Sequence, residues 1–255
     1  MTQSYFDAHL FTLASSLSFK EARIGERISS QLLGAVLHGQ FTAAVRAQLE
    51  QLSPGRIWRH AESLTHIVGS SDSRFPQTDP VVIDLQLPEQ ELSPRLKITP
   101  LDWWPLAEAC RGKCFLRLCV AAGGAAVAGP KKLVKAFPQT RFLIDAFRHG
   151  PASGWQAHAR MAECANVWLT TLGLLPGPQS CWPRTEDVAE ALYFTIGEVG
   201  AGKLLFASGL SWETLAAADP ISWLASVQTL NNSERELILS ANARELFSVG
   251  WFREL

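Results

Sequence analysis

The sequence Phe142-Leu143-Ile144-Asp145-Ala146-Phe147 is an apolar run interrupted by a single acidic residue. Short runs rich in aliphatic and aromatic residues, bounded by turn-forming residues, are typical of buried β-strands. Other segments share this character, so the sequence predicts a series of strands. The predicted strands are residues 5–10, 32–37, 56–61, 95–99, 115–120, 142–147, 166–170 and 203–207.

Amphipathic segments separate several of these strands. In residues 40–52, for example, apolar side chains recur at helical spacing. Parallel strands need a crossover connection each time, usually a helix, and strands alternating with helices over roughly 250 residues are typical of a (β/α)8 barrel. The sequence therefore predicts one α/β domain spanning residues 1–255. Residues 69–94, rich in Ser, Asp, Gln and Pro, are predicted as an irregular loop in which residues 81–85 form an extra strand or a loop edge.

The composition of the 255 residues is that of a globular protein, with 47% hydrophobic and 18% charged residues. The formal net charge of -1 gives no electrostatic footprint for nucleic acid or for an anionic membrane. The five cysteines are odd in number and scattered, which indicates reduced thiols rather than a disulfide framework. No apolar run reaches the ~20 residues of a membrane helix. We therefore expect a cytoplasmic protein without nucleic-acid or membrane partners.

Five segments, in chain order, together carry a resemblance to a known protein family. Residues 6–11 read Phe-Asp-Ala-His-Leu-Phe, and residues 142–151 continue the apolar run quoted above to a Gly-Pro pair. Residues 166–173 form another apolar run, residues 204–211 read Leu-Leu-Phe-Ala-Ser-Gly-Leu-Ser, and residues 233–247 end the series with an Asn-Ala pair and a Leu-Phe pair. These segments resemble strands one, six, seven and eight and the closing helix of the amidohydrolase-related family. The resemblance implies a TIM-like barrel of the metal-dependent hydrolase type.

The resemblance also implies a metal site, most of whose ligands are replaced in this chain. Hydrolases of this type are expected to hold a metal with two histidines of strand one, histidines ending strands five and six, and an aspartate ending strand eight. Such ligands leave one position open for a water molecule, whose pKa then falls toward neutrality. His9 is present, but residues 115–119 contain no histidine. The remaining positions hold Phe11, Ala146 and Gly209. We therefore expect no metal and no other cofactor.

A rebuilt metal site is the alternative. Polar side chains near the ends of the predicted strands could converge at the C-terminal mouth of the barrel, where active sites of this fold lie. Zinc or another divalent metal would then be held by residues outside the family pattern. The candidate ligands are His9, His38, His60, Cys119 and His149. Ordinary core or surface roles are the competing interpretation of these side chains.

Arg117 interrupts the apolar run of the fifth predicted strand. A buried arginine requires a paired anion. If Arg117 points into the barrel, it could act with Arg148 to hold an anionic ligand, or it could pair with an internal acid such as Asp7 or Asp145. Asp7 could also brace the end of strand one without a metal.

Three tryptophans fall in segments that would follow the last three predicted strands. Trp155, Trp182 and Trp212 could line the barrel mouth and offer flat apolar area to a ligand or partner. Packing against neighbouring loops is the alternative role for these side chains.

Two classes of function compete on this sequence. The first is a non-catalytic barrel that forms homo- or hetero-oligomers and binds or stabilises a partner, possibly a catalytically complete amidohydrolase, or that binds a small molecule. The second is a metal-dependent hydrolase or decarboxylase with a displaced site, or metal-free acid–base chemistry at His9 with Asp7 or Asp145. Replacement of four expected ligands favours the first class, since a fold does not by itself determine a reaction.

Overall fold

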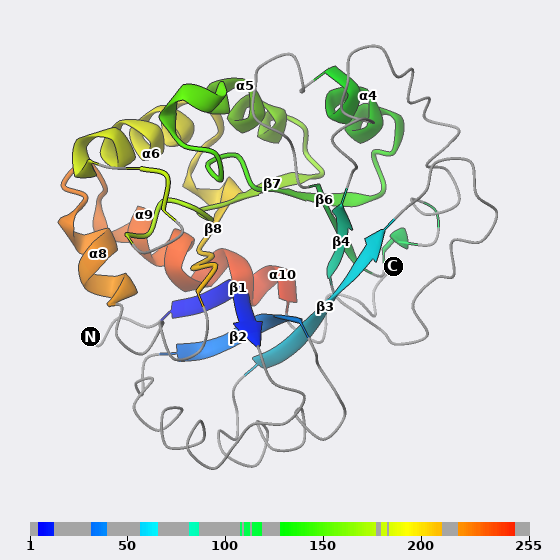
Figure 1. The fold of residues 1–255 in the computed structure, drawn as a ribbon, viewed down its shortest axis with the longest axis horizontal. Helices are drawn as coiled ribbons and strands as arrows, with labels where there is room; N and C mark the ends of the chain where they lie inside the picture. Colours follow the sequence, from blue (N-terminus) through cyan, green and yellow to red (C-terminus); the bar gives the residue numbers. More distant parts are fainter. Residues whose placement is uncertain are drawn as a thin grey trace.

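The computed structural model describes residues 5–12, 32–39, 57–65, 82–86, 108, 110–112, 114–118, 128–176, 180–182, 184–210 and 219–247. Within the first four strands it describes the side chains of Asp7, Val82 and Ile83. Strands and helices alternate from β5 onward, and α4, α5 and α6 lie on the outer side of the strands (Figure 1). None of the described helices combines the length and apolar character needed to cross a lipid bilayer.

The strands are β1 (Tyr5–Thr12), β2 (Leu32–Gly39), β3 (Ile57–Thr65), β4 (Val82–Gln86), β5 (Phe115–Leu118), β6 (Arg141–Ile144), β7 (Val167–Thr170) and β8 (Leu204–Leu205). The helices are α4 (Ala128–Ala136), α5 (Trp155–Ala159), α6 (Thr185–Val199), α8 (Pro220–Ser226), α9 (Asn232–Glu236) and α10 (Asn242–Phe247). Short 3-10 turns are η2 (Pro151–Ser153), η3 (Arg160–Glu163) and η4 (Ala201–Lys203), while η5 (Leu237–Ala241) is a π-helical turn.

The eight strands form one parallel sheet in the order β1 to β8. Each strand therefore lies beside its neighbour in the sequence, which is the strand order of a (β/α)8 barrel. Parallel order also brings the carboxyl ends of all the strands to one end of the sheet. The predicted α/β class is confirmed.

The fourth strand is not where the sequence analysis placed it. Val82–Gln86 pairs in parallel with both β3 and β5, in the middle of the predicted 69–94 loop. The predicted strand at residues 95–99 lies outside the described residues. Residues 81–85 had two possible interpretations, and the structure supports the strand.

Residues of the strands alternate between two apolar clusters, as the two faces of a sheet require. Leu116 and Ile144 belong to the larger cluster, which includes residues of α4, α5 and α6 and fills the layer between sheet and helices. Phe115 and Leu143 belong to the smaller, inner cluster, which includes residues of α10. The rings of Phe115 and Phe247 lie 5.4 Å apart. Because Phe115 is the first residue of β5, α10 closes the barrel at the end where the strands begin.

The closing helix forms as predicted and docks onto β8 through its own backbone. Asn231 caps it, with its side chain accepting from the Glu234 N–H while the Glu234 carboxylate accepts from the Asn231 N–H, a capping box. In the π-helical turn that follows, the Ile238 carbonyl accepts a hydrogen bond of 2.9 Å from the Phe206 N–H. The Asn242 amide donates to the carbonyls of Ala201 and Leu204, both at 2.8 Å. These contacts fix the helix against the last strand.

Candidate functional site

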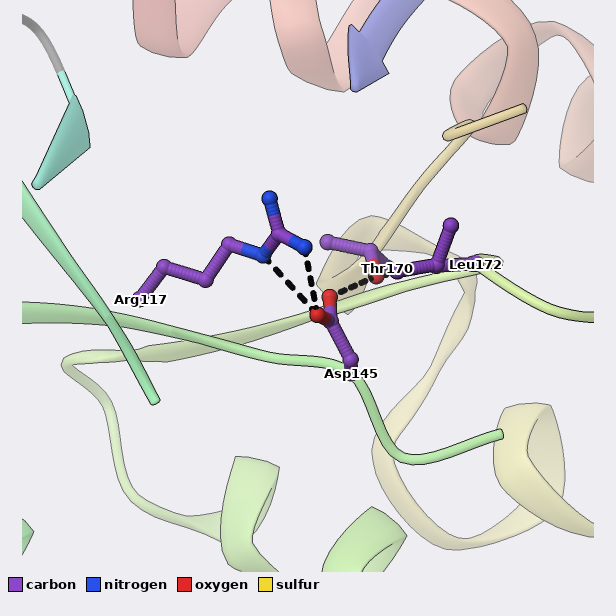
Figure 2. Close-up of polar contacts among 4 residues, drawn as sticks. All are labelled: Arg117, Asp145, Thr170 and Leu172. Atoms are coloured by element: carbon purple, nitrogen blue, oxygen red, sulfur yellow. Dashed lines mark hydrogen bonds and ion pairs between the residues drawn. The ribbon is translucent and has the colours of Figure 1, made fainter. Parts of the chain in front are cut away.

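A buried polar cluster spans the carboxyl ends of β5, β6 and β7 (Figure 2). Asp145 directly follows β6, and its Oδ2 atom accepts hydrogen bonds from Arg117 Nε at 2.8 Å and Nη2 at 2.7 Å. Its other oxygen, Oδ1, accepts from the hydroxyl of Thr170 at 2.6 Å. The Leu172 N–H donates in turn to Thr170 Oγ1 at 3.4 Å. One carboxylate therefore connects three strand ends.

The cluster is removed from solvent. The side chain of Arg117 is 3% exposed and that of Asp145 is 0% exposed. A buried charge is tolerated only when it is paired and hydrogen-bonded, and this pair meets both conditions. Of the two roles considered for an inward Arg117, the structure therefore shows pairing with an internal acid, and that acid is Asp145.

Asp7 makes a second buried contact, between the first and last strands. Its Oδ1 atom accepts from the Ser208 N–H at 3.0 Å, and its Oδ2 atom accepts from the Ser208 hydroxyl. Asp7 is 0% exposed and Ser208 is 5% exposed. Ser208 Oγ also accepts from the Leu210 N–H at 3.1 Å. Asp7 thus braces strand β1 against the segment that follows β8.

Two N–H groups just beyond β8 that face away from β7 have partners outside the sheet. The Phe206 N–H donates to the helix carbonyl of Ile238, and the Ser208 N–H donates to the Asp7 side chain. On the other side, Thr171 N–H donates to the Leu205 carbonyl at 2.9 Å, and Thr171 Oγ1 accepts from the Ala207 N–H at 3.0 Å. On this edge, the segment after β8 is therefore bonded to a helix carbonyl and to an acidic side chain of β1.

Several predicted site residues lie away from these clusters. Arg148 and His149 are exposed in the turn after β6, so Arg148 does not join Arg117 around a common ligand. Trp155 is 3% exposed and packs in α5 against the rings of Phe147, Trp182 and Phe194, with centroids 5.2 to 5.9 Å apart. Trp155 and Trp182 therefore have the packing role in this structure rather than a role in lining the barrel mouth.

The remaining predicted residues are described by backbone alone or lie outside the described residues. His9, His38 and His60 lie in strands β1, β2 and β3, with Phe11 beside His38 and Leu37 beside His60 in the register. His9 falls where the β1–β2 register shifts, between Asp7 and Leu10. Cys119 and Trp212 lie outside the described residues.

The described residues at the strand ends do not fit the metal centre that the resemblance implies. Ala146 is 2% exposed and packs in the cluster between sheet and helices, while the preceding Asp145 points to Arg117. Gly209 has a left-handed backbone with φ of 65° and carries no ligand atom. A divalent cation on Asp145 would meet the guanidinium charge at close range. In the described part of the chain, no three His, Cys, Asp or Glu side chains are grouped so as to hold a metal ion.

Thr170 and Ser208 are site residues that were not predicted from the sequence. Each is a hydroxyl residue at or just beyond the end of an apolar strand, and each binds the carboxylate of an acid named in advance. A polar residue that ends an apolar run is the signal that was available for both. That signal is weak, because the same pattern marks many ordinary strand ends.

His158 is a buried titratable residue outside these clusters. It lies in α5, is 1% exposed, and its Nε2 atom has no hydrogen-bond partner among the described residues. Burial lowers the pKa of His158 to about 4, and the nearby His149 contributes in the same direction. His158 is therefore neutral at physiological pH.

Comparisons with known proteins find structural neighbours. No family model matches the sequence. No curated protein matches it either. An Amidohydrolase 2 protein from Bifidobacterium longum subsp. infantis aligns with a TM-score of 0.60 and 17% identity, over 96% of this chain and 99% of that one.

Two further neighbours have similar coverage. An amidohydrolase from Burkholderia multivorans with bound zinc aligns with a TM-score of 0.64 and 13% identity, over 96% of this chain and 99% of the other. A probable 2-pyrone-4,6-dicarboxylic acid hydrolase from Acinetobacter baumannii, with citric acid bound, aligns with a TM-score of 0.63 and 15% identity. The alignment covers 96% of this chain and 99% of the other. At these identities the likeness concerns the fold. The fold of this chain is that of the amidohydrolase-related TIM barrels.

Proposed function

We propose that this chain is a non-catalytic barrel of the amidohydrolase type, which binds or stabilises a partner instead of hydrolysing a substrate. The observation that carries the proposal is the state of Asp145. Both of its oxygens accept hydrogen bonds, from a guanidinium on one side and a hydroxyl on the other. To bind a metal or abstract a proton, this carboxylate would have to give up contacts that are buried and charge-assisted.

Asp7 supports the same proposal. Its two oxygens accept from the N–H and the hydroxyl of Ser208, so the second candidate acid is used to brace the barrel. General acid–base catalysis needs a group within reach of a substrate proton. Asp7 and Asp145 are both fully buried and directed to partners within the protein.

The partner we propose is a second protein chain, either another copy of this one or a catalytically complete amidohydrolase. Alternatively, the chain binds a small molecule at the barrel mouth without converting it. In either form the chain works without zinc or another divalent metal, and as a single domain in the cytoplasm.

Metal analysis of the purified full chain tests the proposal. Protein produced with zinc and manganese supplied should contain far less than one metal ion per chain, and His9→Ala should leave that content unchanged. The matched control is His158→Gln, which alters a histidine in the helical layer. Stoichiometric metal that is lost in His9→Ala but retained in His158→Gln would establish the alternative, a hydrolase or decarboxylase with a displaced metal site.

The partner is tested separately, by co-expression with complete amidohydrolases and size-exclusion chromatography. A defined complex between this metal-free chain and an active enzyme supports the stabilising role. If the chain elutes as a monomer alone and in every mixture, the partner-binding role is wrong.

A further inference from the structure

We infer that the ends of β6 and β7 form a cation site that the protein fills with its own guanidinium. Asp145 and Thr170 build the site, and Arg117 occupies it from β5. A small guanidinium-class cation from solution should bind there once the Arg117 side chain is removed. The inference rests on the proposed function, in which the barrel holds no metal ion and the cation beside Asp145 is the Arg117 guanidinium.

The geometry separates the site into two halves. Asp145 Oδ1 is held by the Thr170 hydroxyl at 2.6 Å, and this contact involves no atom of Arg117. Asp145 Oδ2 accepts from Arg117, with Nε at 2.8 Å and Nη2 at 2.7 Å. Truncation at position 117 therefore removes the cation and leaves the half of the site that orients the carboxylate in place.

Burial makes the vacated site selective for a cation. The Asp145 side chain is 0% exposed in the unaltered protein, so truncation of Arg117 leaves its carboxylate without a cation in a poorly solvated place. An unpaired buried charge is strongly unfavourable, and any cation that fits and donates hydrogen bonds relieves that cost. Removal of the arginine stem also creates the volume that the ligand needs.

The pattern of donors favours guanidinium over other cations. Two nitrogens of one planar group converge on a single oxygen, and free guanidinium can present the same pair of N–H groups. Ammonium offers a point charge without this planar arrangement. Zinc would find one carboxylate and one hydroxyl at the site, which is a poor ligand set.

Thermal unfolding of the full chain measures this binding. Arg117→Ala is titrated with guanidinium chloride up to ~20 mM at constant ionic strength, far below the molar range in which guanidinium unfolds proteins. A ligand that binds only the folded state raises Tm with concentration, according to its Kd. We expect a rise of several degrees for Arg117→Ala, little change with ammonium or sodium at equal strength, and no rise for the unaltered protein.

Two control variants test whether the effect belongs to this site. Arg160→Ala also removes an arginine from a carboxylate, but Arg160 is 49% exposed and its partner Glu198 is 36% exposed. This variant should show no rise. The double variant Arg117→Ala with Asp145→Ala removes the anion and should lose the response of the single variant.

The outcomes are decisive in both directions. If Arg117→Ala does not fold in plain buffer, recovery of folded protein on refolding with guanidinium supports the site, and Arg117→Gln then replaces it in the titration. An unchanged Tm in the folded variant, or an equal rise of Tm in Arg160→Ala, overturns the inference.

Metal content distinguishes the two proposals. Stoichiometric metal in the unaltered protein contradicts the proposed function, whereas absence of guanidinium rescue contradicts the cation site alone.

Discussion

The carboxylate of Asp7 accepts hydrogen bonds from both the backbone N–H and the hydroxyl of Ser208, 201 residues further along the chain. The first strand is thereby joined to the segment after the last one by a side chain. Both residues are buried, so water cannot replace either hydrogen bond without local opening. Asp7 therefore has a structural role, since it links β1 to the segment that follows β8.

Asp7→Ala should lower the free energy of unfolding by about 2–4 kcal/mol, because it leaves two buried donors of Ser208 without their acceptor. Asp7→Asn should lower it less, since the amide keeps one acceptor oxygen. Urea unfolding of these variants and of Ser208→Ala, combined in a double-mutant cycle, measures the coupling. If Asp7→Ala lowers the free energy of unfolding equally in the unaltered protein and in the Ser208→Ala variant, the two residues are not coupled and the brace is contradicted.

Removal of either partner of the Arg117–Asp145 pair should cost about 3–5 kcal/mol, because each single variant leaves an uncompensated buried charge. The double variant Arg117→Met with Asp145→Leu should recover most of this loss. Chemical denaturation of the single and double variants checks both expectations. The exposed pair of Arg160 and Glu198 serves as the control, and disruption there should change stability by no more than about 1 kcal/mol.

Stability should fall as the pH drops from 7 toward 4, in part because of His158. The pKa of this histidine is about 4 in the folded protein and 6.5 when unperturbed, so the unfolded state binds its proton first. The effect begins as pH falls below 6.5 and ends near 4, where both states are protonated. By pH 5 it amounts to about 2 kcal/mol. Urea unfolding at pH 7.5 and pH 5 measures the loss of unfolding free energy between the two pH values, which should be smaller for His158→Gln than for the unaltered protein. Identical losses in the two proteins would assign the pH dependence to other groups.

Phe11→His restores one histidine expected from the resemblance and should not create a zinc site. Phe11 lies beside His38 in the strand register, yet Asp145 remains paired with Arg117 and Gly209 offers no carboxylate. Isothermal titration with zinc should therefore show no stoichiometric binding beyond that of the unaltered protein. Micromolar affinity in Phe11→His would mean that further ligands are already in place at the barrel mouth.

Seven of the eight strands could be predicted from the sequence. Strands β1 to β3, strands β5 to β8 and the closing helix lie where predicted, within a few residues, because buried parallel strands and amphipathic helices have clear patterns. The fourth strand was misplaced since Val82–Gln86 is a short segment within a stretch rich in Ser, Asp, Gln and Pro. Its assignment depends on pairing with β3 and β5, which a local pattern does not contain.

The candidate site was predictable only in part. Arg117 stood out because a charge inside an apolar strand requires a partner, and Asp145 was among the acids named for it. The choice between Asp7 and Asp145 depends on which strand end lies within reach of the guanidinium. Thr170 and Ser208 are single hydroxyls without periodic signal, so their roles emerge only from the three-dimensional arrangement.

The contact between Asp7 and Ser208 has a consequence for the order in which the chain folds during synthesis. Strand β1 is translated before the partners that hold it in the barrel, because Ser208 lies 201 residues after Asp7 and the π-helical turn follows Ser208. Closing such a long loop is slow compared with forming local contacts. We therefore expect the edge of β1 that faces β8 to gain its partners only after Ser208 and the π-helical turn have been translated, so that the barrel closes late in folding.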